Sequence, residues 1–241
     1  MRIAIMQPYF LPYIGYFQLM SAADKFVLLD DVNFINRGWI NRNRIAVNGE
    51  PCWMTMPLAR ASQNRLINEI EIMADTSWKR KMLRTVELNY RDAPCLSEVL
   101  SLFSEMLEDA HGSLSVFLYR QLKRMSEYLG LTVRIEKTAA VYPKNGKAGQ
   151  DRILDICRRE GADSYINLPG GRDLYDAEPF VAAGIELLFL EPKFSEMNLQ
   201  YGGNEGPVLS ILDLAILNPP AAVRNAICHA YSTASPPTTP G

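Results

Sequence analysis

Strand-like and helix-like segments alternate at both ends of this sequence, and that alternation restricts the fold more than any other feature. Residues 2–6 (RIAIM) are apolar and are followed by Pro8, and residues 13–22 suit a helix. Residues 25–31 (KFVLLDD) contain an apolar run typical of a strand buried on both faces. A strand, a helix and a strand within about thirty residues predict a βαβ unit, whose two strands lie parallel.

The same order of elements returns in the C-terminal half. We expect a helix ending at Gly161, a strand over 164–168 and a second helix ending at Gly184. A strand over 185–190 and a last apolar helix over 210–218 complete the pattern. The sequence therefore predicts an α/β fold, with a parallel open sheet and flanking helices.

Residues 43–58 predict an N-terminal β-hairpin. Asn48-Gly49 lies between two apolar stretches there, and this dipeptide accepts the positive φ angles of a type I′ turn. Residues 67–73 (INEIEIM) and 131–137 (LTVRIEK) alternate with a period of two, and both predict strands.

Between those two strands the spacing of apolar residues becomes helical. Residues 76–130 repeat apolar side chains about one helical turn apart, which predicts a helical insertion in the middle of the chain. We expect a single α/β domain over 1–231 that contains this insertion. Residues 232–241 are small, polar and rich in proline, so they predict a disordered tail.

Composition excludes several classes of protein. The formal net charge is −2 over 241 residues, so no chain-wide basic field favours nucleic acid. No apolar run has the length of a membrane helix and no signal segment is recognisable, which predicts a cytoplasmic protein without a membrane span. The four cysteines lack C-x-x-C spacing, and His111 and His229 complete no triad, so we expect no metal site.

The first candidate site is the proline- and aromatic-rich stretch that follows the first strand. In an open parallel sheet, ligands bind beyond the carboxyl ends of the strands, next to helix N-termini that attract anions. The residues expected to bind substrate there are Gln7, Tyr9, Tyr13, Gly15 and Tyr16. The alternative is that these aromatic rings only wedge the first helix against the sheet.

The second candidate site follows the second strand, at the same edge of the sheet. Asp30 and Asp31 end that strand, and a buried carboxylate needs a partner. The segment after them alternates amides and guanidinium groups, which suits a phosphorylated or nucleotide-bearing ligand. Its expected substrate-binding residues are Asn36, Arg37, Trp39, Asn41, Arg42 and Asn43. The alternative is a solvated arginine loop paired with the two aspartates.

The third candidate site is INLPGGRDLYD, again a strand followed by a turn. Gly170 and Gly171 would let the backbone approach a phosphate, and Tyr175 would close the pocket or cap the next helix. Separately, WKRKMLR (Trp78 to Arg84) carries four cations, which form either a solvated helix face or a contact with phosphate.

Several of these segments resemble the WbqC-like family of bacteria. The resemblance rests on QPYFLPYIGYFQLM, DKFVLLDDVNFINRGWINRNRI, DSYINLPGGRDLYD and LSILDLAILN, and it covers nearly the whole chain except the tail. The family is associated with the biosynthesis of O-antigen lipopolysaccharide and other surface polysaccharides. The resemblance implies a cytoplasmic enzyme acting on a nucleotide-linked sugar, and some members are credited with attaching an amino acid such as glycine to a sugar amine.

The first turn is also similar, more distantly, to the nucleotidylyltransferase fold. There an H-x-G-H element binds the phosphates of the nucleotide. Here Tyr13, Gly15 and Tyr16 occupy the corresponding positions and no histidine is present, a departure that counts against adenylation chemistry while leaving the fold possible.

These observations lead to an expected activity: a transferase that forms an amide on the amine of a nucleotide-linked amino sugar. Asp31, with Asp30 beside it, is the expected base, and Arg37, Arg42 and Asn43 are expected to hold phosphates or an oxyanion. The acyl donor stays open among aminoacyl-tRNA, another acyl carrier and an adenylate made from ATP. The alternatives are a nucleotidyl- or glycosyl-transferring enzyme and a non-catalytic scaffold, and the oligomeric state is open.

Overall fold

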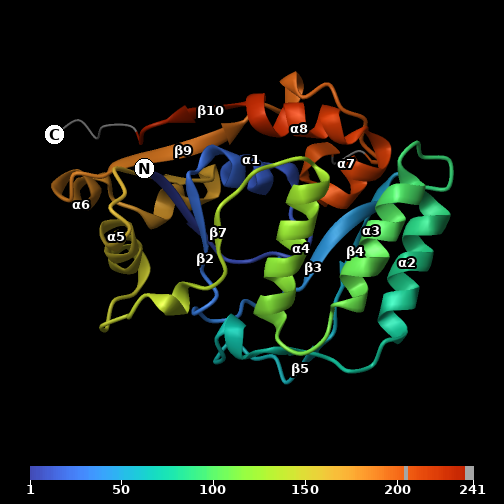
Figure 1. Ribbon diagram of the computed structural model, residues 1–241, viewed down its shortest axis with the longest axis horizontal. Helices are drawn as coiled ribbons and strands as arrows, with labels where there is room; N and C mark the ends of the chain where they lie inside the picture. Colours follow the sequence, from blue (N-terminus) through green and yellow to red (C-terminus); the bar gives the residue numbers. More distant parts are fainter. Residues whose placement is uncertain (204–205, 237–241) are drawn as a thin grey trace.

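A central sheet of six strands, in the order β10-β9-β8-β1-β2-β7, organises residues 1–203 and 206–236, which the computed structural model describes (Figure 1). Within this sheet β1, β2, β7, β8 and β9 run parallel to one another, and β10 runs antiparallel to β9. The strands are β1 (Arg2–Met6), β2 (Lys25–Leu28), β7 (Ile135–Glu136), β8 (Ser164–Asn167), β9 (Glu186–Pro192) and β10 (Tyr231–Ala234). The predicted α/β fold with a parallel open sheet is confirmed.

The order of the strands reverses beside β1. The chain moves outward from β1 through β2 to β7, and then returns to the opposite side of β1 with β8, β9 and β10. The reversal therefore lies between β1 and β8. In open α/β sheets, ligands bind in the crevice at the carboxyl ends of the strands at such a point.

Successive side chains of the parallel strands point to opposite faces of the sheet, and both faces are buried. In β1, Ile3 and Ile5 join one core cluster and Ala4 joins the other. The helices α5 (Gly149–Arg159) and α6 (Ala177–Ala182) cover the first face. The second face is covered by α1 (Ile14–Ala22), α7 (Ile211–Leu217) and α8 (Pro220–His229).

Three helices form the predicted helical insertion and extend the second layer beyond the sheet (Figure 1). They are α2 (Ser77–Asn89), α3 (Leu96–Glu108) and α4 (Leu114–Tyr128). Their apolar stripes are buried in the same cluster as α1, because each stripe repeats about one turn apart. The single domain over 1–231 stays a prediction.

The predicted hairpin forms between β3 (Arg42–Val47) and β4 (Glu50–Thr55). Asn48 and Gly49 have φ angles of 53° and 82°, as a type I′ turn requires. A second, two-residue pair joins β5 (Leu58–Ala59) to β6 (Glu71–Ile72).

Three local predictions are wrong in part. Residues 67–73 form a 3₁₀ turn (Ile67–Glu69) before the short β6, since the Glu69 carboxylate accepts from the backbone N–H of Leu66 and curls the chain. Residues 131–137 supply only the two-residue β7. Helix α8 was not expected, although proline is compatible with the first turn of a helix and Pro220 begins it.

The tail prediction also needs correction. Residues Tyr231–Ala234 form β10, whose backbone pairs with β9 along the edge of the sheet. A polar sequence is tolerated there because an edge strand needs backbone partners more than buried side chains. Residues 237–241 of the predicted disordered tail lie outside the described residues. In the part of the chain that the structure describes, no helix is long and apolar enough to cross a bilayer.

Candidate functional site

A cavity of about 680 Å³ opens at the carboxyl ends of β1 and β8, where the strand order reverses. Three segments form most of its walls: the loop after β1, the β3–β4 hairpin with the loop before it, and the turn after β8. Pro192 at the end of β9, Phe194 just after it and Val208 add to the lining. Its size lies within the range of small-molecule sites, and its position is the one expected for a ligand in an open α/β sheet.

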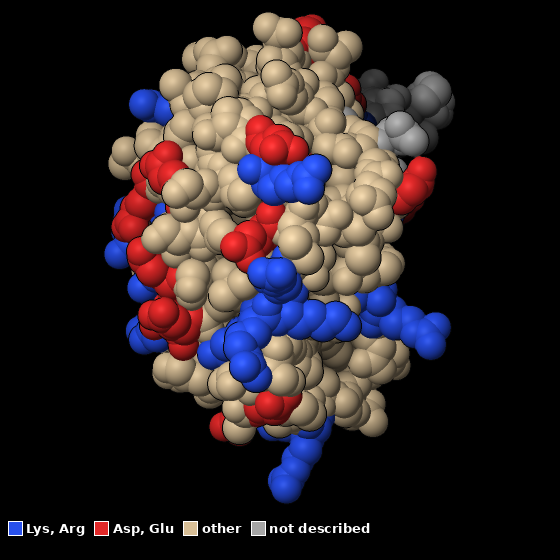
Figure 2. Space-filling model, turned by 90° about the vertical axis from the view of Figure 1, so that its right-hand side faces the viewer, with Lys and Arg blue, Asp and Glu red and all other residues tan. Residues whose placement is uncertain are grey.

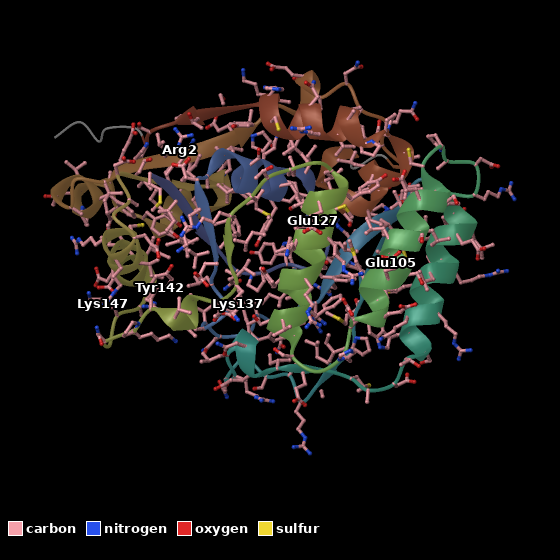
Figure 3. The ribbon with its side chains drawn as sticks, in the orientation of Figure 1. Arg2, Glu105, Glu127, Lys137, Tyr142 and Lys147 are labelled. Atoms are coloured by element: carbon pink, nitrogen blue, oxygen red, sulfur yellow. The ribbon has the colours of Figure 1, made fainter. Side chains whose placement is uncertain are left out.

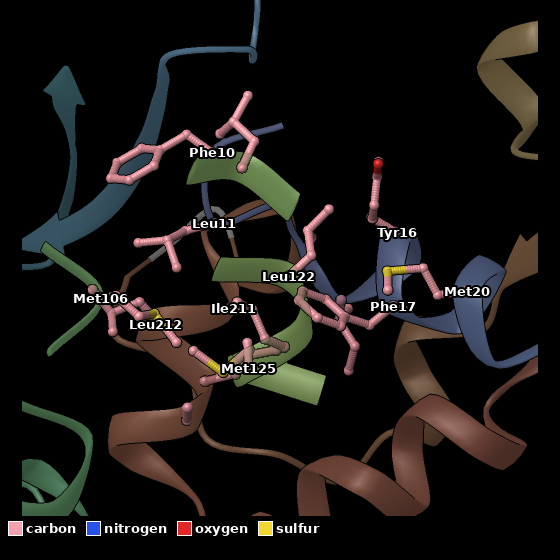
Figure 4. Packing of buried hydrophobic residues seen from close by; sticks show 14 of the residues in the cluster. Phe10, Leu11, Tyr16, Phe17, Met20, Met106, Leu122, Met125, Ile211 and Leu212 are labelled. Atoms are coloured by element: carbon pink, nitrogen blue, oxygen red, sulfur yellow. The ribbon is translucent and has the colours of Figure 1, made fainter. Parts of the chain in front are cut away.

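The loop after β1 contributes both to the cavity and to the core. Gln7, Tyr9 and Tyr13 line the cavity. Phe10 and Leu11 do not line it and are buried in the core cluster with residues of α4 and α7 (Figure 4). Neither the Tyr9 nor the Tyr13 hydroxyl has a hydrogen-bond partner within the described residues, so both are available to a ligand. In this stretch some residues therefore line the cavity, as a binding site would require, whereas others pack in the core, as the alternative interpretation expected.

Side chains from distant elements hold this loop rigidly. Gln121 of α4 donates to the Tyr9 carbonyl at 2.7 Å and accepts from the Leu11 N–H at 2.9 Å. Asn43 and Ser210 both donate to the Leu11 carbonyl, at 2.7 and 2.8 Å. Leu11 itself has a φ of 41°, a conformation that a leucine adopts only when its surroundings impose it. The wall of the cavity is thus preorganised.

Gly15 and Tyr16, predicted to bind substrate, do not line the cavity. Tyr16 is fully buried, and its hydroxyl donates to the Gln7 carbonyl at 2.9 Å. A side chain at Gly15 would collide with the Tyr13 ring, only 2.5 Å from the position of a Cβ atom. These residues position the loop rather than reach the cavity.

On the hairpin side, Trp39, Asn43 and Arg44 line the cavity. The amide of Asn43 is already engaged, because it bonds the Leu11 carbonyl and accepts from the Arg44 N–H at 2.8 Å. Asn43 therefore links the hairpin to the first loop. Arg44 belongs to the same run of arginines and amides as Arg42, but it was not among the residues expected to bind substrate. Its signal was its place in that run.

The other predicted residues of this segment lie outside the cavity lining. Arg42 stacks over Trp53 at 4.0 Å and donates to the Gly38 carbonyl at 3.1 Å. Asn41 donates to a backbone carbonyl of the neighbouring strand end. Asn36 and Arg37 are exposed on the loop. The expected phosphate contacts of Arg37 and Arg42 are not found at the cavity, because Arg37 is exposed on the loop and Arg42 is held by Trp53 and the Gly38 carbonyl.

The turn after β8 forms the third wall, and it includes the predicted Gly170, Gly171 and Tyr175. Asn167, which was not predicted, donates to the Tyr175 hydroxyl at 3.2 Å. A Cβ atom at Gly171 would lie 2.9 Å from the Asn167 amide nitrogen, whereas one at Gly170 would meet nothing within 4 Å. The signal for Asn167 was a polar residue at the end of a buried strand.

Asp30 and Asp31, the predicted base and its neighbour, are buried and do not line the cavity. The Asp30 carboxylate accepts from the Ser115 hydroxyl and from the Thr138 hydroxyl, the latter at 2.7 Å. Burial raises the pKa of Asp30. The Asp31 carboxylate is paired with Arg152 at 3.0 Å. Neither carboxylate has the access to a substrate amine that a catalytic base requires.

Both aspartates instead anchor the segment between β7 and α5, which carries Tyr142 and Lys147 (Figure 3). Arg152 of α5 donates to the Tyr142 carbonyl at 2.7 Å, and Lys144 donates to the Asp31 carbonyl. Lys147, which precedes α5, forms an ion pair with Asp155 within that helix. This network of ion pairs and hydrogen bonds joins the chain after β2 to α5.

The described lining of the cavity includes a cation and hydrogen-bond donors. Among the described residues, no aspartate or glutamate lines it, whereas Arg44 does. The positive end of α1 begins immediately after Tyr13, with no acidic residue in its first turn. Burial, with a smaller contribution from Tyr9, raises the pKa of Tyr13 to about 12, and burial raises that of Tyr9. Both hydroxyls are therefore protonated near neutral pH and can donate hydrogen bonds.

The basic run on α2 lies apart from this site. Arg80, Lys81 and Arg84 are exposed and do not line the cavity. Figure 2 shows lysine and arginine side chains gathered on the face of the molecule that α2 borders. The ion pair of Arg84 with Glu87 is itself exposed. This arrangement fits the solvated-face interpretation. In the described ranges, no group of three or more histidines, cysteines or carboxylates could hold a metal ion.

Comparisons with known proteins agree with the resemblance seen in the sequence. A profile of the WbqC-like protein family matches residues 7–225, a span that contains all three walls of the cavity. A Mycobacterium tuberculosis (strain ATCC 25618 / H37Rv) protein named "Uncharacterized protein Rv1507c" is 29% identical over 216 residues, which cover 88% of this chain and 92% of that protein. No solved structure matches. The chain belongs to the WbqC-like protein family.

Proposed function

We propose that this protein is a transferase that attaches an acyl or aminoacyl group, such as glycyl, to the amine of a nucleotide-linked amino sugar used for O-antigen or a related surface polysaccharide. The observation that carries the proposal is the cavity at the reversal of strand order, which combines a cation, protonated tyrosines and an open backbone turn. Membership of the WbqC-like family supports a biosynthetic role.

In this proposal the phosphates of the ligand lie near Arg44 and the start of α1. An arginine offers a fork of donors that suits phosphate oxygens, and a helix N-terminus offers free backbone N–H groups. The sugar lies toward Gly170, where the absence of a side chain leaves the turn open. The cavity of about 680 Å³ has room for a ligand of this kind.

The chemistry needs no carboxylate in the cavity. The lone pair of a neutral amine attacks the carbonyl carbon of the acyl donor, so a C–N bond forms and the carbonyl oxygen becomes an oxyanion. The bond to the leaving group then breaks, and the leaving group takes the electron pair and the proton released by the amine. In this proposal Tyr9 and Tyr13, which line the cavity, donate to the oxyanion. The donor is aminoacyl-tRNA, an acyl carrier or an adenylate made from ATP.

Incubation of the protein with amino-sugar nucleotides and each class of donor tests the proposal. Mass spectrometry should detect a product heavier by one acyl group, and a nucleotide sugar with a hydroxyl in place of the amine should give none. Tyr13→Phe removes one oxyanion donor and should lower kcat by about 10²- to 10³-fold. Tyr119→Phe, on α4 and outside the cavity lining, is the matched control. Absence of amide with every combination of donor and acceptor would refute the transfer.

A further inference from the structure

Two tryptophans and two arginines interleave beside the cavity: Trp39 and Arg44 line it, and Trp53 and Arg42 pack against them outside its lining. The Trp39 and Trp53 rings lie 5.3 Å apart, and Arg42 lies 4.0 Å above the Trp53 ring. Arg44 lies 5.3 Å from the Trp39 ring and 5.4 Å from the Trp53 ring. Despite these contacts, Trp39 is 37% exposed and Trp53 is 43% exposed. Large aromatic surfaces of this kind remain open to a further planar group.

The hairpin fixes this cluster in place. Arg42 and Arg44 lie two apart on β3 and therefore share a face, and Trp53 is the direct partner of Arg44 across the strands. Trp39 precedes the hairpin, and its carbonyl accepts from the Phe10 N–H at 3.0 Å, which joins it to the first loop. Trp39 lies outside the hairpin, so stacking that only stabilised the hairpin would not need it. Trp39 also lines the cavity together with Arg44, which connects the cluster to the cavity.

Other exposed residues of the cavity lining are apolar. Leu174 lines the cavity although it is 67% exposed, and Ile35 and Val208 are further exposed apolar residues of the lining. Gln7 and Asn167 are polar residues of the same lining. A ligand that complements this lining carries a flat, weakly polar group beside Trp39 and a polar group near Gln7 and Asn167.

We propose that the cluster of Trp39, Trp53, Arg42 and Arg44 is a stacking subsite for the nucleobase of a nucleoside diphosphate. This inference rests on the proposed function, and it sets the direction of the ligand. The base lies at the hairpin, the diphosphate lies beside Arg44, and the sugar points toward the turn after β8. Aromatic rings and guanidinium planes bind bases through their faces, with little dependence on the identity of the base.

Isothermal titration calorimetry with a panel of nucleoside diphosphates, and with pyrophosphate as a ligand that has no base, tests this inference. Trp53→Ala should weaken the tightest nucleoside diphosphate by about 5- to 150-fold, the range for stacking on one aromatic ring, and should leave pyrophosphate affinity unchanged. The matched control is Cys52→Ala, an exposed neighbour whose side chain points to the other face of the strand. In the wild type, the bound base should also quench tryptophan fluorescence.

Three results would overturn the subsite. They are equal weakening of both ligands by Trp53→Ala, no weakening of either, or tighter binding of a short polyprenyl phosphate than of every nucleoside diphosphate. The same experiments distinguish failure of the subsite from failure of the proposed transfer reaction. If no amide forms but nucleotide affinity depends on Trp53, the subsite stands and the proposed transfer does not. If amide forms and Trp53→Ala leaves the KM for the nucleotide sugar unchanged, only the subsite fails.

Discussion

Gln121 provides the most direct test of how the cavity wall is held. This side chain is buried on α4, and its amide satisfies two backbone groups of the loop after β1. Gln121→Met keeps a similar shape but offers neither donor nor acceptor. The N–H of Leu11 and the carbonyl of Tyr9 would then lose their partners.

The size of the effect follows from those two groups. Each buried polar group left without a partner costs about 1–3 kcal/mol, which gives about 2–6 kcal/mol for the pair. The Tyr9 carbonyl bond is only partly buried, so water would recover some of this cost, and we expect a loss of about 2–4 kcal/mol in the free energy of unfolding. That is a large fraction of the about 5–15 kcal/mol that stabilises a typical domain.

Urea denaturation followed by circular dichroism measures this loss. Arg120→Met is the matched control, because the neighbouring position on the same helix is exposed, and it should change stability by less than about 0.5 kcal/mol. Folded Gln121→Met should also bind nucleotide more weakly, since Tyr9 lines the cavity. A stability equal to that of the wild type would refute the view that this glutamine holds the loop.

Three further predictions concern other parts of the molecule. Asp31→Asn breaks a buried ion pair and should cost about 3–5 kcal/mol in urea denaturation, with turnover per folded molecule retained; lost turnover at unchanged stability would restore Asp31 as the base. Burial raises the pKa of Asp213, so the folded state holds that proton more tightly and wild-type stability falls as pH rises from about 4 toward the folded pKa. Asp213→Asn cannot ionise and should therefore gain stability relative to the wild type as the pH rises above about 4, and a constant difference would contradict this. Gly171→Ala should destabilise the protein by about 1–3 kcal/mol by crowding Asn167, whereas Gly170→Ala should fold normally and weaken ligand binding; equal thermal stability of the two variants would contradict the clash.

Much of the fold could be predicted because its signals are local. Asn48-Gly49 sets the hairpin turn by itself, since both residues tolerate positive φ. The two-sided apolar runs of β1 and β2 required layers on both faces of a parallel sheet. Short edge elements were less predictable. The strand β10 has a polar sequence, and only the exposed edge of β9 provides the partner that makes it a strand.

The candidate site divides in the same way. The loop after β1 and the glycine turn after β8 were expected at one edge of the sheet, and Tyr9, Tyr13 and Gly170 do line one cavity there. The polar residues after β2 could not be sorted by type or spacing. Asp31 was expected at the site, but it forms a buried ion pair with Arg152 of α5, which lies more than a hundred residues later in the chain.

The sequence by itself determined the main strands and helices, the hairpin turn, and that rings, amides and arginines gather after the strands. Only the tertiary structure decided which of those side chains face the cavity and which face the core. Tyr13 and Tyr16 are three residues apart with the same chemistry, yet one lines the cavity and the other is fully buried. The physical reason is that local backbone preferences act over a few residues, whereas the direction of a polar side chain is set by the partners that distant segments bring to it.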